Sequence, residues 1–487
     1  MQPASTAASL SFARRGAWFE AGSGRMLAVL VAALLVVNVA LCFPGTMMND
    51  SYMQYREAVS RQFSDWHPPV MAWLWSKLRV VHEGPAPLFL LHLVFYWTAI
   101  GLIADGARRG GHRTIAVLIA LAGAFPPFVF MNANVVKDVG MAVALLGAVA
   151  IVFWHRVQAR QLHLAAMTAV GLLLLYGTLV RTNAVFALGP LLLYAVAPAS
   201  WIRNARIAVV SLLVAIVAIP VSHAINNTLF HPEERHAVES LFLYDLIGIA
   251  AQERDPQLLE PRATMTQADL KRCYTPFWWD TFSSWGPCGA LVHRHDPDRA
   301  TTGDGLALQW VKTIRDHPAA YLAHRLKHFN SELFFAVPLK HLRLAPEYRG
   351  GDSHFPPYAV FTPSEVKFDL VRKNPSTWPV TWFVWAGVLA LFLARHAPTP
   401  PVLFARALLF SALGYTAAYA VIGVATDFRY HYWSMLATAI ATLIVLPHIG
   451  HGFRTRAPVL TGGAALVALV VAIGLVTRLL DFQAWVL

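Results

Sequence analysis

Long, almost uncharged apolar runs recur along the whole chain, and they limit how it can fold. Each run spans roughly 17–20 residues, the length that an α-helix needs to cross the hydrocarbon core of a bilayer. Hydrophobic residues make up 56% of the 487 residues and charged residues only 14%, whereas about 25% of a soluble domain is charged. The pattern predicts an all-α polytopic membrane protein. Basic residues flanking membrane spans then explain the net charge of +12, so no nucleic-acid partner is inferred.

Eleven runs qualify as candidate membrane spans. They lie at residues 26–43, 86–104, 114–131, 136–154, 163–180, 184–200, 207–223, 378–394, 404–424, 431–448 and 459–477. The start of the fourth run is the weakest, because Lys137 and Asp138 lie there. No small-residue cleavage site follows the first run, so we expect it to remain as a span rather than to be removed as a signal peptide.

Basic residues are unevenly distributed between the two sides of these spans. If the N-terminus is cytoplasmic, the inner segments carry Arg14, Arg15, Arg25, Arg108, Arg109, Arg113, Arg156, Arg160, Arg203, Arg206, Arg395, Arg406, Arg454 and Arg456. Cytoplasmic loops of membrane proteins are enriched in Lys and Arg. The asymmetry therefore predicts a cytoplasmic N-terminus, with the segments 44–85 and 224–377 and the C-terminus on the outer side.

The spans divide the chain into four parts. These are a disordered cytoplasmic tail (1–25), an N-terminal transmembrane module (26–223), an extracytoplasmic domain (224–377) and a C-terminal transmembrane module (378–487). Within the extracytoplasmic domain, helical periodicity is present in AVESLFLYDLIGIAAQ, GDGLALQWVKTIRDHP and PAAYLAHRLKHFNSELF. The stretch 341–377 is rich in Pro, Gly and aromatic residues and predicts a loop.

Two cysteines, Cys273 and Cys288, fall in the extracytoplasmic domain. Outside the cytoplasm a disulfide is chemically permitted, and two cysteines at this spacing could close one. Two free thiols are the alternative. No CxxC or HxxxH pattern accompanies them, so a zinc site is not indicated.

Several polar side chains lie within the helical patterns of the same domain. Asp245 interrupts an apolar helix, and His324, Arg325 and His328 share another helix. They could line a groove for an acceptor. Helix caps and surface charges are the favoured interpretation.

The first outer loop, residues 44–85, contains two aspartates that could carry chemistry. Asp50 lies just beyond the first span, where an ionised carboxylate could accept the proton of an attacking hydroxyl. A helix cap or a solvated loop acid is the ordinary alternative. Asp65 begins the sequence Asp-Trp-His-Pro-Pro, whose prolines, Pro68 and Pro69, stiffen the backbone around His67.

Asp65 and His67 could position a sugar, polarise an acceptor or share a divalent cation. One Asp/His pair is weak evidence for a metal site, so no metal or cofactor is assigned, and a divalent cation remains an option. After Pro69, apolar residues recur at helical spacing and predict a short helix lying in the membrane interface. An early start of the second span is the alternative.

Three cations oppose the charge asymmetry, because Lys137, Arg181 and Arg429 lie in tight turns on the outer side. Attraction to a phosphate group at the depth of the lipid headgroups explains them. Pairing of Lys137 with Asp138, and of Arg429 with Asp427, is the alternative. Arg181 has no acidic neighbour in the sequence, which makes it the strongest phosphate candidate. Asp138 and Tyr430 complete this predicted binding set.

Four features of the sequence occur together in a known superfamily. They are an Asp shortly after the first span, a loop ending in His-Pro-Pro, an interfacial helix and a late outer domain. The sequence thereby resembles the GT-C superfamily of membrane glycosyltransferases, and most closely the branch of protein O-mannosyltransferases and aminoarabinose transferases. The matching residues are Asp50 with Ser51 and Gln54, and the segment Asp65 to Pro69. The segments LVRTNAVFALGPLLL and DFRYHYW are also similar to bacterial members.

The resemblance implies an inverting hexosyl- or pentosyltransferase of a bacterial inner membrane. Its donor would be a sugar on a polyprenyl phosphate, and its acceptor a hydroxyl of a lipid, glycan or protein on the outer face. Asp50 would be the base, Gln54 and His67 would bind substrate, and the three outer cations would stabilise the departing phosphate. The family often has two neighbouring acids after the first span. Here the second acid is Asp65, so both aspartates are candidate catalytic residues, with Asp50 preferred.

Two other classes of membrane protein are alternatives to a glycosyltransferase of this kind. A lipid-linked polysaccharide polymerase or O-antigen ligase also has about a dozen spans and a large outer loop, but relies on basic residues in that loop. A transporter or flippase would place charges at mid-membrane depth and contain repeated halves. The sequence contains no P-loop, Rossmann glycine motif, GxSxG elbow or HExxH motif.

Overall fold

The computed structural model describes residues 5–202, 204–284, 286–292, 303–339 and 373–480. Within these ranges the protein is helical, and its only β-type pairings are isolated bridges. The predicted all-α architecture is therefore confirmed. Most of the predicted loop at 341–377, up to residue 372, lies outside the described residues.

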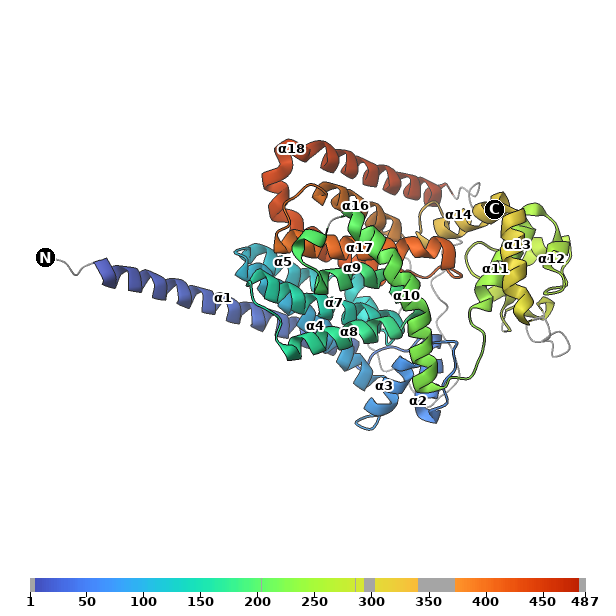
Figure 1. Ribbon diagram of the computed structural model, residues 1–487, viewed down its shortest axis with the longest axis horizontal. Helices are drawn as coiled ribbons and strands as arrows, with labels where there is room; N and C mark the ends of the chain where they lie inside the picture. Colours follow the sequence, from blue (N-terminus) through green and yellow to red (C-terminus); the bar gives the residue numbers. More distant parts are fainter. Residues whose placement is uncertain (1–4, 203, 285, 293–302, 340–372, 481–487) are drawn as a thin grey trace.

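The helices follow the predicted order (Figure 1). The N-terminal module contains α1 (Ser5–Cys42), α2 (Asn49–Ser60), α3 (Val70–Leu78), α4 (Ala86–Arg109), α5 (Arg113–Gly123), α6 (Pro126–Asn132), α7 (Lys137–Val157), α8 (Leu164–Leu179), α9 (Val185–Val196) and α10 (Asn204–Phe230). The extracytoplasmic segment contains α11 (Glu239–Glu253), α12 (Gln267–Cys273), α13 (Gly303–Asp316) and α14 (Pro318–Glu332). The C-terminal module contains α16 (Pro379–Leu393), α17 (Pro400–Ile422) and α18 (Tyr432–Leu479).

Among the described residues, seven helical segments are long and apolar enough to cross a membrane, and the bent pair α5–α6 makes an eighth. Three shorter apolar helices, α8, α9 and α16, coincide with the remaining predicted spans. Each of the eleven predicted segments thus falls on a helix or on the bent pair, and the chain is a multi-pass membrane protein. The long α18 supplies the last two candidate spans.

Two local predictions are decided by the helix boundaries. α1 already begins at Ser5, so the prediction of a disordered tail up to residue 25 is wrong from that residue onward. The helix expected after Pro69 is α3, and it ends seven residues before α4 begins at Ala86. The alternative of an early second span is therefore excluded. Trp75 on α3 is fully buried and donates to the carbonyl of Gly84 at 2.9 Å, which fixes the turn between α3 and α4.

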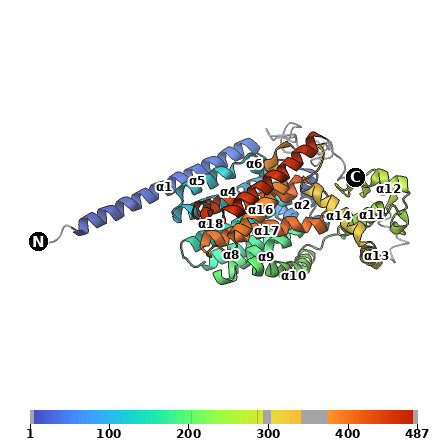
Figure 2. The same ribbon diagram turned by 90° about the horizontal axis from the view of Figure 1, so that it is seen from above.

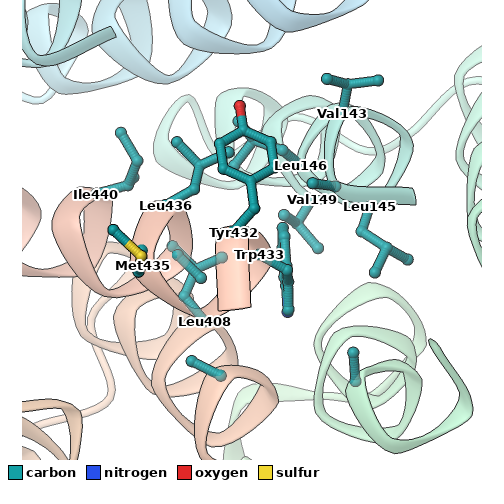
Figure 3. Close-up of a cluster of buried hydrophobic side chains, with 14 of the residues drawn as sticks. Val143, Leu145, Leu146, Val149, Leu408, Tyr432, Trp433, Met435, Leu436 and Ile440 are labelled. Atoms are coloured by element: carbon teal, nitrogen blue, oxygen red, sulfur yellow. The ribbon is translucent and has the colours of Figure 1, made fainter. Parts of the chain in front are cut away.

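The bundle is packed around α7, the most buried of the candidate spans. Figure 3 shows Leu146 and Val149 of α7 meeting Leu408 of α17 and Leu436 of α18 in one apolar cluster. In the same cluster, the hydroxyl of Tyr432 donates to Asn132 at 2.8 Å. The end of α6, five residues before the predicted site residue Lys137, is thereby held against the start of α18.

Helices α11, α12 and α13 share a hydrophobic core of their own. Together with α14 they form a lobe at the opposite end of the molecule from the start of α1 (Figures 1 and 2). A disulfide joins Cys273 to Cys288, so the alternative of two free thiols is excluded. All three helical segments expected in this domain are present, with Pro318 at the first position of α14.

The polar side chains of this lobe are not surface charges, contrary to the favoured interpretation. Asp245, His324 and Arg325 are at most 4% exposed. His324 lies 3.2 Å from Asp245, and Trp310 donates to the same carboxylate at 2.8 Å. His328 on the next turn of α14 is also fully buried. The sequence failed here because α11 and α14 pack polar faces against each other, and the partners of these groups lie far away along the chain.

Candidate active site

Asp50 is held in place by the chain that precedes α7. The backbone of Thr46 pairs with that of residues 133–135, with N–H···O distances of 2.7 and 2.9 Å. Ser51, next to Asp50, donates its hydroxyl to the carbonyl of Val135 at 2.7 Å. These contacts dock the start of α2 against the turn that leads into Lys137. The first-loop aspartate and the first outer cation are therefore neighbours in space, although 87 residues separate them.

The carboxylate of Asp50 faces three basic side chains. Its Oδ2 lies 2.9 Å from Nη1 of Arg429 and 3.9 Å from Nζ of Lys137, and its Oδ1 lies 4.0 Å from Nε2 of His67. Burial acts to raise the pKa of Asp50, but the charges of Arg429, His67 and Lys137 outweigh it and hold that pKa well below its usual range. Asp50 is therefore an ionised carboxylate at physiological pH.

His67 supports the site as a neutral ring. Burial and the nearby charge of Lys137 lower the pKa of His67 to about 3. The Lys137 ammonium accordingly donates to Nδ1 of His67 at 2.7 Å. That contact occupies one ring nitrogen, and no group of three or more His, Cys, Asp or Glu side chains in the described part of the chain is arranged to hold a metal ion. The geometry gives His67 a role in orienting Lys137.

Arg429 is fixed by the short helix that precedes α18. Asp427 caps this helix, accepting the backbone N–H of Arg429 at 3.0 Å, and its second oxygen lies 2.8 Å from Nε of the same arginine. The pairing of Arg429 with Asp427, the alternative weighed for this cation, is therefore present. It leaves Nη1 directed at Asp50, so one guanidinium bridges two carboxylates.

Arg181 does have an acidic neighbour in space, so that part of the sequence argument is wrong. Its Nη1 lies 2.6 Å from Asp138, while Nε and Nη2 donate to the hydroxyls of Tyr415 and Tyr419 at 3.0 and 2.9 Å. The guanidinium also lies over the ring of Tyr430, 4.6 Å from its centroid. Asp138 thus pairs with Arg181 rather than with the adjacent Lys137, because the first turn of α7 directs the two side chains to different partners.

These groups surround a cavity of about 2220 Å³. Seven of the nine predicted site residues line it, namely Asp50, Asp65, His67, Lys137, Arg181, Arg429 and Tyr430. The volume exceeds the roughly 300–1,000 Å³ of an ordinary small-molecule pocket. It is large enough to receive two substrates together.

The remaining predictions are placed less centrally. Gln54 is fully buried one turn along α2 from Asp50 and does not line the cavity, and Asp138 lies behind Arg181. Asp65 lines the cavity but accepts the backbone N–H of Arg235 at 2.6 Å. That bond ties the first outer loop to the segment following α10. Asp65 therefore acts as an anchor for the loop, in contrast to the cation-surrounded Asp50.

Sequence reasoning missed one wall of the cavity. This wall is formed by Trp278, Trp279 and Asp280, which belong to the loop between the two disulfide-bonded cysteines. None of the three was among the predicted site residues. Removal from bulk water and the nearby charge of Asp50 raise the pKa of Asp280 to about 6, although its side chain is exposed within the cavity. The available signal was the aromatic run YTPFWWD between Cys273 and Cys288.

Part of the N-terminal module is similar to a known family. Residues 66–223 match the family model described as dolichyl-phosphate-mannose-protein mannosyltransferase, which belongs to the GT-C superfamily. The match begins at Trp66 and includes His67, Lys137 and Arg181. Neither the curated proteins nor the solved structures contain a significant match. The family match, which covers about a third of the chain, and the membrane-spanning helices together support a membrane glycosyltransferase of the GT-C type.

Proposed function

We propose that the protein transfers a sugar from a polyprenyl-phosphate donor to an acceptor hydroxyl of a lipid, glycan or protein, on the outer face of a bacterial inner membrane. One observation carries the proposal: an ionised carboxylate, Asp50, lies among Arg429, Lys137 and His67 in a large cavity. Cations are the groups that bind a phosphate, and the carboxylate is the group that accepts a proton.

The cations and Asp50 depend on each other. The charges of Arg429 and Lys137 lower the pKa of Asp50 and make it a weak base. A bound donor phosphate would share those cations and let the pKa of Asp50 rise. The acceptor oxygen then attacks the anomeric carbon while its proton passes to Asp50. The bond from that carbon to the phosphate oxygen breaks, and polyprenyl phosphate leaves on the opposite side, with inversion, stabilised by the same cations.

Two further features support a lipid donor and an outer location. Ile219 on α10 lines the cavity and is also 49% exposed, on a helix that carries many other exposed apolar side chains. A polyprenyl chain could therefore lie along α10 while its phosphate reaches the cavity. The Cys273–Cys288 disulfide supports an oxidising compartment for the lobe, since disulfides are rare in the cytoplasm.

The proposal is tested with the purified full chain in lipid nanodiscs. Polyprenyl phosphates carrying labelled mannose, glucose or arabinose are supplied together with membrane lipid, glycan or protein fractions. We expect one donor to be converted to sugar-free polyprenyl phosphate while its label appears in one acceptor fraction. Transfer from a nucleotide sugar instead, or no consumption of any lipid-linked donor, would overturn the proposal.

A further inference from the structure

The loop between the two disulfide-bonded cysteines carries a run of aromatic residues that line the cavity. Phe277, Trp278 and Trp279, with Asp280 immediately after them, all line the cavity. Aromatic faces with a few well-placed polar groups are the usual lining of sites for amphipathic ligands. The composition of this wall differs from that of the lining around Asp50, which lies among cations.

Two kinds of contact fix this loop within its own neighbourhood. The first is the disulfide, which joins the two ends of the loop. Its backbone pairs with the segment that leads to Asp427, because the N–H of Trp279 donates to Val424 at 2.8 Å and that of Thr426 donates to Phe277 at 2.7 Å. A loop that is already ordered is suited to binding a ligand, because the entropy cost of ordering a mobile loop would weaken the binding.

Buried side chains of α14 hold the same loop from behind. His328 Nδ1 and the hydroxyl of Ser331 both donate to the carbonyl of Pro276, at 2.7 and 3.0 Å. Arg325 donates to the carbonyl of Gly423 at 2.6 Å. The buried polar groups of the lobe therefore position the disulfide loop and the strand-like segment beside it.

The loop also meets the first outer loop. The rings of Trp66 and Trp279 lie with their centroids 6.4 Å apart, and Trp66 is the neighbour of His67. Trp279 is only 3% exposed, whereas Trp66 and Trp278 are half-buried and line the cavity. Trp279 thus acts as packing, and the other two indoles present faces that a ligand can reach.

Asp280 adds a polar group to this wall, within the electrostatic field of the reacting centre. Removal from bulk water, and then the charge of Asp50, raise the pKa of Asp280, while the charge of Arg429 opposes them. A sugar ring has one apolar C–H face and a rim of hydroxyl groups. An indole face beside a carboxylate matches both features, because the ring can stack while a hydroxyl donates to the acid.

We propose that Trp66, Trp278 and Asp280 form the subsite for the sugar ring of the lipid-linked donor. The inference rests on the proposed function and adds where the sugar lies. Trp278 stacks on the ring, and Asp280 accepts a hydrogen bond from a ring hydroxyl. The subsite makes the disulfide loop the element that selects the donor sugar, whereas the cations around Asp50 hold the phosphate common to all donors.

The titration of Asp280 gives one arm of the test. At pH 7.5 Asp280 is ionised and accepts the sugar hydroxyl well. As the pH falls through about 6 it becomes neutral and a weaker acceptor. We expect kcat/KM for the donor to fall about tenfold between pH 7.5 and pH 5 in the wild type. The part of the fall centred near pH 6 should be missing in Asp280→Asn, because the pKa of Asp50 lies far lower and that of His67 is about 3. Lys137 is the same in both proteins, as is Asp427, whose pKa burial raises, so neither contributes to the difference between their profiles.

The second arm compares two probes on the full chain in nanodiscs: the glycosylated donor that the wild type uses, and sugar-free polyprenyl phosphate. Trp278→Ala and Asp280→Asn are each expected to weaken binding of the glycosylated donor about tenfold and to leave binding of sugar-free lipid within twofold. Trp201→Ala is the matched control, since Trp201 is an exposed tryptophan that does not line the cavity. It should change neither affinity.

The outcomes separate the two proposals. Equal loss of both probes, no loss of either, or a rise only in the KM of the acceptor would overturn the sugar subsite. A wild type that binds neither probe would overturn the proposed function as well. Melting temperatures of the variants within a few degrees of the wild type establish that a lost affinity reflects the subsite rather than unfolding.

Discussion

Asp50→Asn is expected to lower kcat for sugar transfer by about 10²–10⁴-fold, the usual contribution of a positioned general base. Asparagine has nearly the same shape but cannot take up the proton of the attacking hydroxyl. The loss is measured as release of polyprenyl phosphate under single-turnover conditions. Because the substitution leaves Ser51 and its bond to Val135 intact, the start of α2 should keep its position.

For the same variant, we do not expect the affinity for polyprenyl phosphate to fall as the rate does. Asp50 competes with a donor phosphate for Arg429 and Lys137, so its neutralisation should leave affinity for sugar-free polyprenyl phosphate unchanged or tighter. Asp316→Asn is the control, because Asp316 is a surface acid paired only with the adjacent Arg315 among the ion pairs found. It should retain wild-type rates. A variant Asp50→Asn that keeps more than a tenth of the wild-type kcat would exclude Asp50 as the base.

Arg181→Gln is expected to be damaging in two separable ways. It leaves Asp138, 1% exposed, as an unpaired buried carboxylate, and breaking such a pair costs about 3–5 kcal/mol of stability. It also removes a positive charge from the wall of the cavity, where one such group contributes roughly 10²–10³-fold to the rate. Thermal unfolding in detergent and single-turnover transfer measure the two effects.

The double variant Arg181→Gln/Asp138→Asn separates stability from catalysis. With both charges removed, no uncompensated carboxylate remains, so the melting temperature should recover most of the loss seen in Arg181→Gln. The rate of transfer should stay at least about 10²-fold below that of the wild type. Recovery of activity together with stability would reduce Arg181 to a structural partner of Asp138, and the phosphate would then be held by Lys137 and Arg429 alone.

Much of the membrane architecture was predictable because it follows from local composition. Each span is a run of apolar residues, and α3 follows from helical spacing after Pro69. Asp50, Lys137 and Arg429 all line one cavity. Their proximity was predicted only indirectly, because the two cations lie on the outer side, where basic residues are otherwise scarce. Their side-chain partners were not predictable. Asp138 and Arg181 meet across two helices, and sequence neighbours gave the wrong partner.

The lobe was predicted least well, for a physical reason. A buried polar network such as Asp245 with His324 and Arg325 has the same composition as a solvated helix face, and only packing distinguishes the two. The wall formed by Trp278 and Asp280 depends on where the disulfide loop pairs with the backbone of Val424 and Thr426, a contact between segments about 145 residues apart. The local periodicity of a sequence cannot predict contacts between segments so far apart.

An experimental structure of the Asp50→Asn variant with the donor that the wild type uses tests the central claim most directly. Without its base, the variant should hold the intact donor. We predict phosphate oxygens about 2.7–2.9 Å from the nitrogens of Arg429 and Lys137, with the anomeric carbon facing residue 50 and the polyprenyl chain along α10. A donor phosphate bound away from Arg429, Lys137 and Arg181, or a sugar turned away from residue 50, would contradict the account.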